Sequence, residues 1–166
     1  LSLAAMWAPV AFAGSERSPC RVRNVTQGTS TSSFRVVVTL ARDGDRLQVR
    51  GTCHPRGIAI DKDLVIRGMG KGATLDGQAR YRVLRIRRGA VVTLRHLVLT
   101  HGRPARSKVD FLVGGAGVSN RGTLTLTDAA VQDNTASWGG GVGNGGTLPM
   151  NGSVVRDNRA GWDGAG

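Results

Sequence analysis

The sequence is poor in aromatic and acidic residues. Phe, Trp and Tyr make up 4% of its 166 residues, so Val, Leu, Ile and Ala must fill the core of the one domain that this length suits. Asp and Glu number 11 against 23 Lys and Arg, which gives a formal charge of +12. No apolar run reaches the roughly 20 residues of a membrane-spanning helix. The 25 glycines do not recur at every third position, which excludes collagen.

The first 13 residues carry no charge and end in Ala11-Phe12-Ala13. This small-x-small pattern is typical of a signal-peptidase site. We interpret residues 1–13 as a signal-peptide remnant, the alternative being a buried N-terminal strand. We further expect an N-terminal cap region at 14–43 and repeated coils at 44–166, truncated at the C-terminus. The remnant predicts a secreted or cell-surface protein.

Export would expose the two cysteines to an oxidising compartment. We therefore expect Cys20 and Cys53 to form a disulfide, the alternative being two free thiols. The three histidines, His54, His96 and His101, do not fall at metal-ligand spacings. We predict no metal site and no cofactor.

The second half of the chain contains an internal repeat. Residues 118–138 match residues 142–162 at ten of 21 positions with an offset of 24. Within each unit, short apolar alternations such as Leu124-Thr125-Leu126 are typical of strands and too short for helices. A chain that returns every 24 residues would rise by one strand spacing, about 4.8 Å, per turn. The pattern indicates a parallel β-helix.

The same alternation continues upstream with weaker identity. Strands are expected near 47–49, 58–60, 64–66, 74–75, 83–86, 92–94 and 97–99. Residues 101–113 exceed the basic period, so we interpret them as a protruding loop.

The segment 33–42 (SFRVVVTLAR) is ambiguous. Its apolar residues fit one helical face and Ser33 could cap a helix, whereas three successive valines favour a strand. Because the open end of a solenoid needs a cover, we favour a short capping helix.

These patterns carry a resemblance. The segments 44–53 (GDRLQVRGTC) and 60–68 (IDKDLVIRG), with the repeated GGGV…N-x-GTL…V-x-DN-x-A pattern, resemble secreted bacterial right-handed parallel β-helix proteins of the pectate-lyase-like superfamily. The repeats are also similar to polymorphic outer-membrane adhesins. The resemblance covers the chain from about Cys20 onward. It implies an all-β fold, a right-handed parallel β-helix with a short N-terminal capping helix.

Several residues recur at equivalent positions of the two repeats. Asn120 with Asn144, and Asn134 with Asn158, are expected to form hydrogen-bonded ladders at the ends of strands. Trp138 and Trp162 would form an aromatic ladder. Such a ladder either stabilises a turn or contacts sugar rings.

Basic residues are concentrated between positions 80 and 108, where nine occur without an acidic one. We expect Arg85, Arg87 and Arg95 to point outward and form a basic face that attracts acidic polysaccharide or another anionic surface. The alternative is a solvated basic surface. Specific nucleic-acid binding is not expected, because no aromatic residues are interleaved with these arginines.

No catalytic signature is complete. The carboxylates are scattered, whereas a lyase or glycosidase needs several of them close together. If the chain is catalytic, the candidates are Asp76, Asp61 and Arg87, and the sequence His101-Gly102 is similar to a dipeptide of polygalacturonase-like enzymes. We assign no catalytic residue and expect a structural, adhesive or acidic-glycan-binding module. The alternative is a polysaccharide lyase or glycoside hydrolase whose site lies partly outside this chain.

Overall fold

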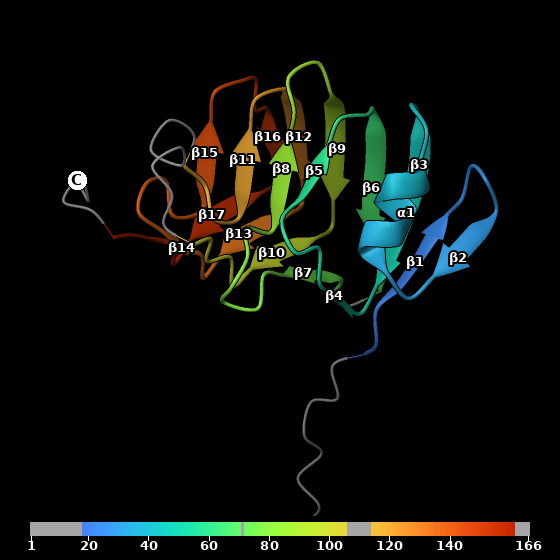
Figure 1. The fold of residues 1–166 in the computed structure, drawn as a ribbon, viewed down its shortest axis with the longest axis horizontal. Coiled ribbons are helices and arrows are strands. Elements are labelled where there is room, and N and C mark those ends of the chain that lie inside the picture. The colour runs from blue at the N-terminus through green and yellow to red at the C-terminus, as the bar shows by residue number, and fades with distance from the viewer. Residues whose placement is uncertain (1–17, 71, 106–113, 162–166) are drawn as a thin grey trace, which may run out of the picture.

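Three β-sheets, built mainly from parallel strands, form the body of the protein (Figure 1). The computed structural model describes residues 18–70, 72–105 and 114–161. One helix, α1 (Phe34–Leu40), lies at the N-terminal end of the sheets. The protein is therefore mostly β-strand, as the sequence predicts.

The largest sheet has seven strands in the order β16-β12-β9-β6-β3-β1-β2. Their bounds are Arg21–Asn24 (β1), Thr29–Thr31 (β2), Asp45–Arg50 (β3), Leu64–Gly68 (β6), Val91–Arg95 (β9), Thr123–Thr127 (β12) and Met150–Asn151 (β16). The five-stranded sheet contains Thr52–Cys53 (β4), Thr74–Asp76 (β7), Val98–Thr100 (β10), Ala130–Gln132 (β13) and Val154–Arg156 (β17). The four-stranded sheet contains Ile58–Ile60 (β5), Leu84–Ile86 (β8), Val118–Asn120 (β11) and Val142–Asn144 (β15). A two-stranded sheet pairs Thr135–Ala136 (β14) with Arg159–Ala160 (β18).

The chain visits the three large sheets in a fixed order. From β3 to β15, a strand of the seven-stranded sheet is followed by one of the five-stranded sheet and then by one of the four-stranded sheet, with β14 of the two-stranded sheet inserted before β15. Each return adds a parallel neighbour to the previous strand, so segments far apart in sequence lie side by side. Among the described strands, the two antiparallel ladders are those of β1 with β2 and of β1 with β3.

The offset of 24 appears directly in the strand register. Val118 lies opposite Val142 in the four-stranded sheet, and Val131 lies opposite Val155 in the five-stranded sheet. In the seven-stranded sheet Leu126 lies opposite Met150. The repeated residues are therefore neighbours across strands.

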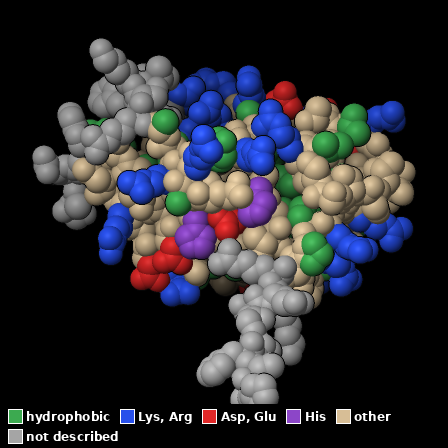
Figure 2. Space-filling view, turned by 60° about the horizontal axis from the view of Figure 1, so that its bottom comes forward, with side chains coloured by type: hydrophobic (Ala, Val, Ile, Leu, Met, Phe, Trp, Pro, Cys, Tyr) green, Lys and Arg blue, Asp and Glu red, His purple; other side chains and the backbone are tan. Residues whose placement is uncertain are grey.

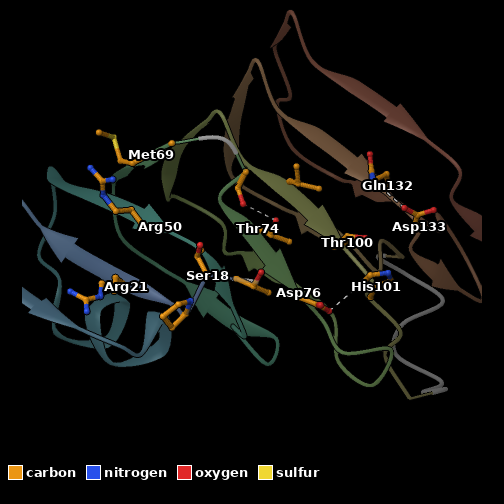
Figure 3. A pocket seen from close by; sticks show the side chains of 16 residues that line it. Ser18, Arg21, Arg50, Met69, Thr74, Asp76, Thr100, His101, Gln132 and Asp133 are labelled. Carbon is orange, nitrogen blue, oxygen red and sulfur yellow. Dashed lines mark hydrogen bonds and ion pairs between the residues drawn. The ribbon is translucent and has the colours of Figure 1, made fainter. Parts of the chain in front are cut away.

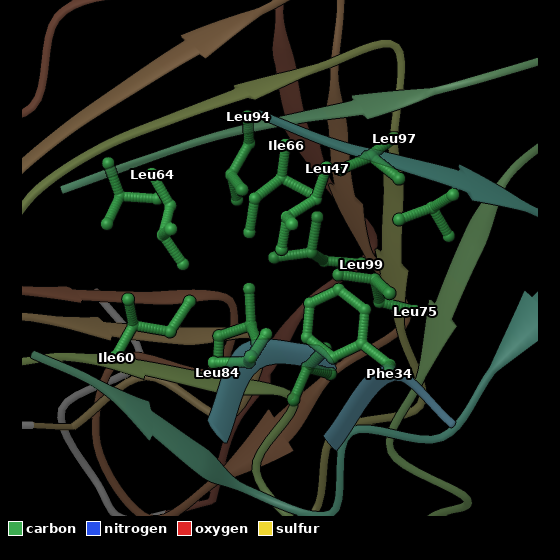
Figure 4. Packing of buried hydrophobic residues seen from close by; sticks show 14 of the residues in the cluster. Phe34, Leu47, Ile60, Leu64, Ile66, Leu75, Leu84, Leu94, Leu97 and Leu99 are labelled. Atoms are coloured by element: carbon green, nitrogen blue, oxygen red, sulfur yellow. The ribbon is translucent and has the colours of Figure 1, made fainter. Parts of the chain in front are cut away.

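Aliphatic residues fill the space between the sheets (Figure 4). Along each strand the side chains alternate between the interior and the surface, so that Leu47, Ile66, Leu94 and Leu126 occupy one inward register of the seven-stranded sheet. All four are at most 1% exposed. These stacked layers of similar side chains explain how the core forms with so few aromatic residues.

The segment 33–42 forms a helix, not a strand. Ser33 is its N-cap, and the Val36 backbone N–H donates to Ser33 Oγ at 3.4 Å. Phe34, Val37 and Val38 are buried, and Phe34 packs among the core leucines in Figure 4. The need to cover the end of the core overrides the strand preference of the valines.

A buried carboxylate connects the first strands to the helix. Asp45 Oδ2 accepts hydrogen bonds from Asn24 Nδ2 at 2.7 Å and from the Arg42 backbone N–H at 2.8 Å. Gln27 Nε2 donates to the same oxygen. The Arg42 backbone N–H, more than any other neighbour, lowers the pKa of Asp45 below its ordinary value of 3.8.

The expected disulfide between Cys20 and Cys53 is present, and it ties the segment before β1 to β4. Within the described ranges, no helix has the length and hydropathy that crossing a bilayer requires. The expected signal-peptide remnant at 1–13 and residues 106–113 of the expected loop lie outside the described residues.

Candidate functional site

The structure does not bring the three predicted surface arginines onto one sheet. Arg85 is exposed on β8 of the four-stranded sheet, opposite Ala59 and Ser119. Arg87 is exposed in the turn that follows β8. Arg95 lies on β9 of the seven-stranded sheet. The prediction that Arg95 continues the face of Arg85 is wrong, because only ten positions separate them and the chain changes sheet between them.

Arg95 belongs instead to a larger group of arginines, which we call the arginine face. Its members occupy exposed, outward positions of the seven-stranded sheet: Arg21 and Arg23 on β1, Arg46 and Arg50 on β3, Arg67 on β6 and Arg95 on β9. Arg67 lies directly opposite Arg95, and Arg21 lies directly opposite Arg50. Neighbouring strands are about 4.8 Å apart, so the backbones of these paired arginines are adjacent and their positive side chains project from the same face of the sheet.

The positive charge of this face is not balanced locally. The outward positions among these arginines are taken by uncharged residues, Gln48, Val65 and Thr93. Asp45, the acidic residue of β3, is 3% exposed and satisfied by its own hydrogen bonds. In the part of the chain that the structure describes, none of the six arginines forms an ion pair with a carboxylate.

One end of the arginine face is hollowed. A depression of about 590 Å³ lies over β1, β2 and β3. Its lining combines three of the arginines with neutral hydrogen-bonding side chains, namely Arg21, Arg23, Arg50, Gln48, Ser30, Thr31 and Ser32. Such a lining suits a ligand that carries both anionic groups and hydroxyls.

A second depression, of about 710 Å³, lies over the five-stranded sheet, and we call it the polar groove (Figure 3). Arg21 and Arg50 line both depressions. The polar groove runs from these arginines past Thr74 to Asp76 and His101. Figure 2 shows the side of the molecule that carries this sheet, where histidine and acidic side chains lie together among scattered basic ones.

Asp76 and His101 approach each other in the polar groove. Asp76 Oδ1 lies 3.4 Å from His101 Nδ1, and it accepts a hydrogen bond from the Gln78 backbone N–H at 2.7 Å. The Asp76 side chain is 6% exposed, whereas that of His101 is 45% exposed. The side chain before Asp76, Leu75, points into the core, and His101 follows the last residue of β10 with a φ of 50°. Sequence patterns single out both residues, but none of them indicates that the two side chains meet.

The other two catalytic candidates lie elsewhere. Asp61 follows β5 and Arg87 follows β8, so both lie at the ends of strands in the four-stranded sheet. Asp76 is on the five-stranded sheet. The structure therefore separates Asp76 from Asp61 and Arg87.

The two asparagine pairs are stacked. Asn120 Nδ2 donates to Asn144 Oδ1 at 2.8 Å, and Asn134 Nδ2 donates to Asn158 Oδ1 at 2.9 Å. Trp138 is 38% exposed, and its expected partner Trp162 lies outside the described residues.

Among the described side chains, no group of three or more His, Cys, Asp or Glu is arranged to hold a metal ion. No family model, curated protein or solved structure matches this chain. The arginine face and the polar groove are therefore the features of this chain from which a function can be inferred.

Proposed function

We propose that this chain is a secreted or cell-surface right-handed parallel β-helix whose arginine face binds acidic polysaccharide. The repeated order of the three sheets and the in-register neighbours 24 positions apart support the β-helix. The resemblance of its repeats to those of the pectate-lyase-like superfamily and of polymorphic outer-membrane adhesins also supports the proposal. The Cys20–Cys53 disulfide fits an oxidising compartment.

The observation that carries the binding proposal is the direct pairing of Arg67 with Arg95. Two positively charged side chains that project from directly paired positions, with backbones about one strand spacing apart, repel each other, and an anion between them relieves this repulsion. Arg50 and Arg21 repeat this arrangement on the next two strands of the sheet, β3 and β1. A chain of anionic groups that crosses the strands would relieve both repulsions at once.

A polysaccharide suits this face better than a nucleic acid. Single-stranded nucleic acids are bound by basic grooves that also stack bases on aromatic side chains. The outward positions of β3, β6 and β9 hold no aromatic residue. Gln48, Ser30 and Thr31 instead offer hydrogen bonds to hydroxyl groups beside the arginines.

The test is retention on immobilised polygalacturonate. We expect the double variant R67A/R95A to lose at least tenfold in affinity, because it removes the central pair of charges. The matched control is R121A/R159A, which removes two exposed arginines that lie outside the arginine face. Equal retention of the two double variants would contradict the proposal.

A second candidate function, as a polysaccharide lyase or glycoside hydrolase, is favoured by one observation. Asp76 and His101 lie close together in an open groove, where a histidine oriented by a carboxylate can act as a general base. Incubation with polygalacturonate or alginate in the presence of calcium separates the two functions. Under the binding proposal no unsaturated uronide and no new reducing end is formed.

A further inference from the structure

Two Asn-Gly pairs lie in the second repeat, Asn144-Gly145 and Asn151-Gly152. An asparagine that precedes glycine is prone to spontaneous deamidation, because glycine has no side chain that would hinder attack by its own backbone nitrogen. That nitrogen attacks the side-chain amide of the asparagine. Both pairs contain the same two reacting residues, so a difference in their reactivity must come from the structure around them.

The first pair is held by hydrogen bonds. Asn144 Oδ1 accepts from Asn120 Nδ2 at 2.8 Å, and Asn144 Nδ2 donates to the Gly146 carbonyl at 3.1 Å. The Gly145 backbone N–H, whose nitrogen would have to attack, donates to the Asn120 carbonyl at 2.8 Å. Because this backbone bond must break before the nitrogen can react, the structure protects Asn144.

The second pair is open. Asn151 and Gly152 are both exposed. The Asn151 side-chain amide and the Gly152 backbone N–H make no hydrogen bond with any group in the ranges that the structure describes. Gly152 has a φ of 57°, and a side chain at this position would collide with the Asp128 carboxylate. The fold therefore requires the glycine and leaves its nitrogen free to react.

Asn151 continues a row of the arginine face. Arg67 lies opposite Arg95 on the seven-stranded sheet. Thr127 of β12 lies opposite both Arg95 and Asn151, and Figure 1 shows β16 beside β12. The backbone of Asn151 is thus two strand spacings, roughly 10 Å, from that of Arg95. A charge at Asn151 would act on the same ligand as Arg95 at low salt.

We propose that Asn151 is a deamidation site that places a negative charge at the end of the arginine face. The Gly152 nitrogen forms a bond to Asn151 Cγ, the Cγ–Nδ2 bond breaks, and Nδ2 leaves as ammonia with the proton of the Gly152 N–H. Water then adds to one of the two carbonyl carbons of the cyclic imide and opens it to aspartate or isoaspartate. The reaction consumes water alone and needs no oxidant or reductant.

The new charge weakens the binding of a polyanion, a consequence that rests on the proposed function of the arginine face. An anionic chain that crosses the strands past Arg67 and Arg95 reaches Asn151 next to Thr127. A carboxylate at this position repels the chain. The reactivity of Asn151 itself depends only on the local structure, so the two parts of the proposal can be tested separately.

Mass spectrometry measures the reactivity. The whole chain is incubated in mildly alkaline buffer and then cleaved chemically after Met150, which places Asn144 and Asn151 in different peptides. We expect Asn151 to deamidate about tenfold faster than Asn144, because Gly145 must first lose a hydrogen bond. In concentrated urea the two rates should become similar. Equal rates in the folded protein, or a faster rate at Asn144, would overturn the assignment of the site.

Retention on immobilised polygalacturonate measures the consequence. N151D introduces the charge without isomerisation, and N144D is the matched control because it adds the same charge to the four-stranded sheet. At low salt we expect N151D to bind about two- to fourfold more weakly and N144D to bind like wild type.

The outcomes separate this proposal from the previous one. Equal retention of N151D and wild type, with R67A/R95A weakened, shows that the modification does not act on the arginine face. If R67A/R95A also keeps full retention, the arginine face is wrong, whereas faster deamidation of Asn151 than of Asn144 still establishes the site. Thermal unfolding of each variant verifies that it is folded.

Discussion

At the scale of single residues, the burial of Asp45 has a consequence for stability. Its carboxylate collects hydrogen bonds from Asn24, Gln27 and the Arg42 backbone, and these bonds favour the charged form. The pKa of Asp45 is lower in the folded chain than its ordinary value of 3.8. The contribution of Asp45 to the free energy of unfolding is complete above the pKa of the unfolded state and is lost as pH falls through the pKa of the folded state.

We predict that D45N removes the loss of stability at low pH that protonation of Asp45 causes. The variant should be about 1–3 kcal/mol less stable at pH 7, because the Asn side chain turns one acceptor into a donor among buried donors. Below pH 3.8 the difference between D45N and wild type should shrink. Urea unfolding at several pH values measures it, with D61N, a change at an exposed carboxylate, as the control. A constant difference across the pH range would contradict this assignment.

At the scale of elements, the asparagine pairs hold turns between successive strands. Asn134 is fully buried, accepts from the Gly102 backbone N–H at 2.7 Å, and donates to the Leu99 carbonyl at 3.1 Å and to Asn158. One side chain therefore serves three successive turns of the chain. Asn144 is exposed and donates to the Gly146 carbonyl at 3.1 Å, so water can replace its hydrogen bonds.

We predict that N134A destabilises the protein by about 1–3 kcal/mol, because it leaves buried backbone groups without partners. N144A should change stability by less than about 0.5 kcal/mol, as expected for an exposed position. Chemical denaturation of the two variants measures both values. Equal losses of stability in N134A and N144A would show that the stacking of the asparagines, not their burial, determines the free energy that each contributes.

The same elements show how far the sequence alone could lead. The identical offset of 24 placed Val118 over Val142, and the capping pattern at Ser33 predicted the helix. The arginine face could not be predicted, because the number of residues between paired positions on neighbouring strands changes. Asp45 lies opposite Leu64, and Leu64 lies opposite Val92. No fixed period connects Arg67 to Arg95 or Arg23 to the rest. The alternation of Arg21 with Arg23, and of Arg46 with Arg50, was the available signal.

The polar groove could be predicted even less. Asp76 and His101 are adjacent because β7 and β10 pair with Asp76 opposite Thr100, and this register follows from how Leu75 and Leu99 stack in the core. The left-handed backbone of His101 then turns its ring toward the carboxylate. Sequence patterns predict the individual strands. They do not predict which residues lie opposite each other when the strands differ in sequence, because that register depends on packing in the core.

At the scale of the whole molecule, the net charge of +12 attracts any polyanion. This general attraction and the local effect of the arginine face make different predictions. Both R67A/R95A and R121A/R159A lose two positive charges, so a protein that bound through net charge alone would respond equally to them. A local site would respond to the first pair and hardly to the second.

Salt separates the two effects further. The screening length is about 10 Å at 0.1 M salt and about 3 Å at 1 M, so a polyanion held by exposed guanidinium groups should be released steeply over this range. We predict that R121A/R159A keeps the salt dependence of wild type on immobilised polygalacturonate, whereas R67A/R95A shows a shallower one because fewer charges meet the ligand. Retention at several salt concentrations measures the slopes. Equal slopes for the two variants would mean that the polyanion responds to the net charge of the whole molecule. A slope near zero for wild type would exclude electrostatic binding both by the arginine face and by net charge.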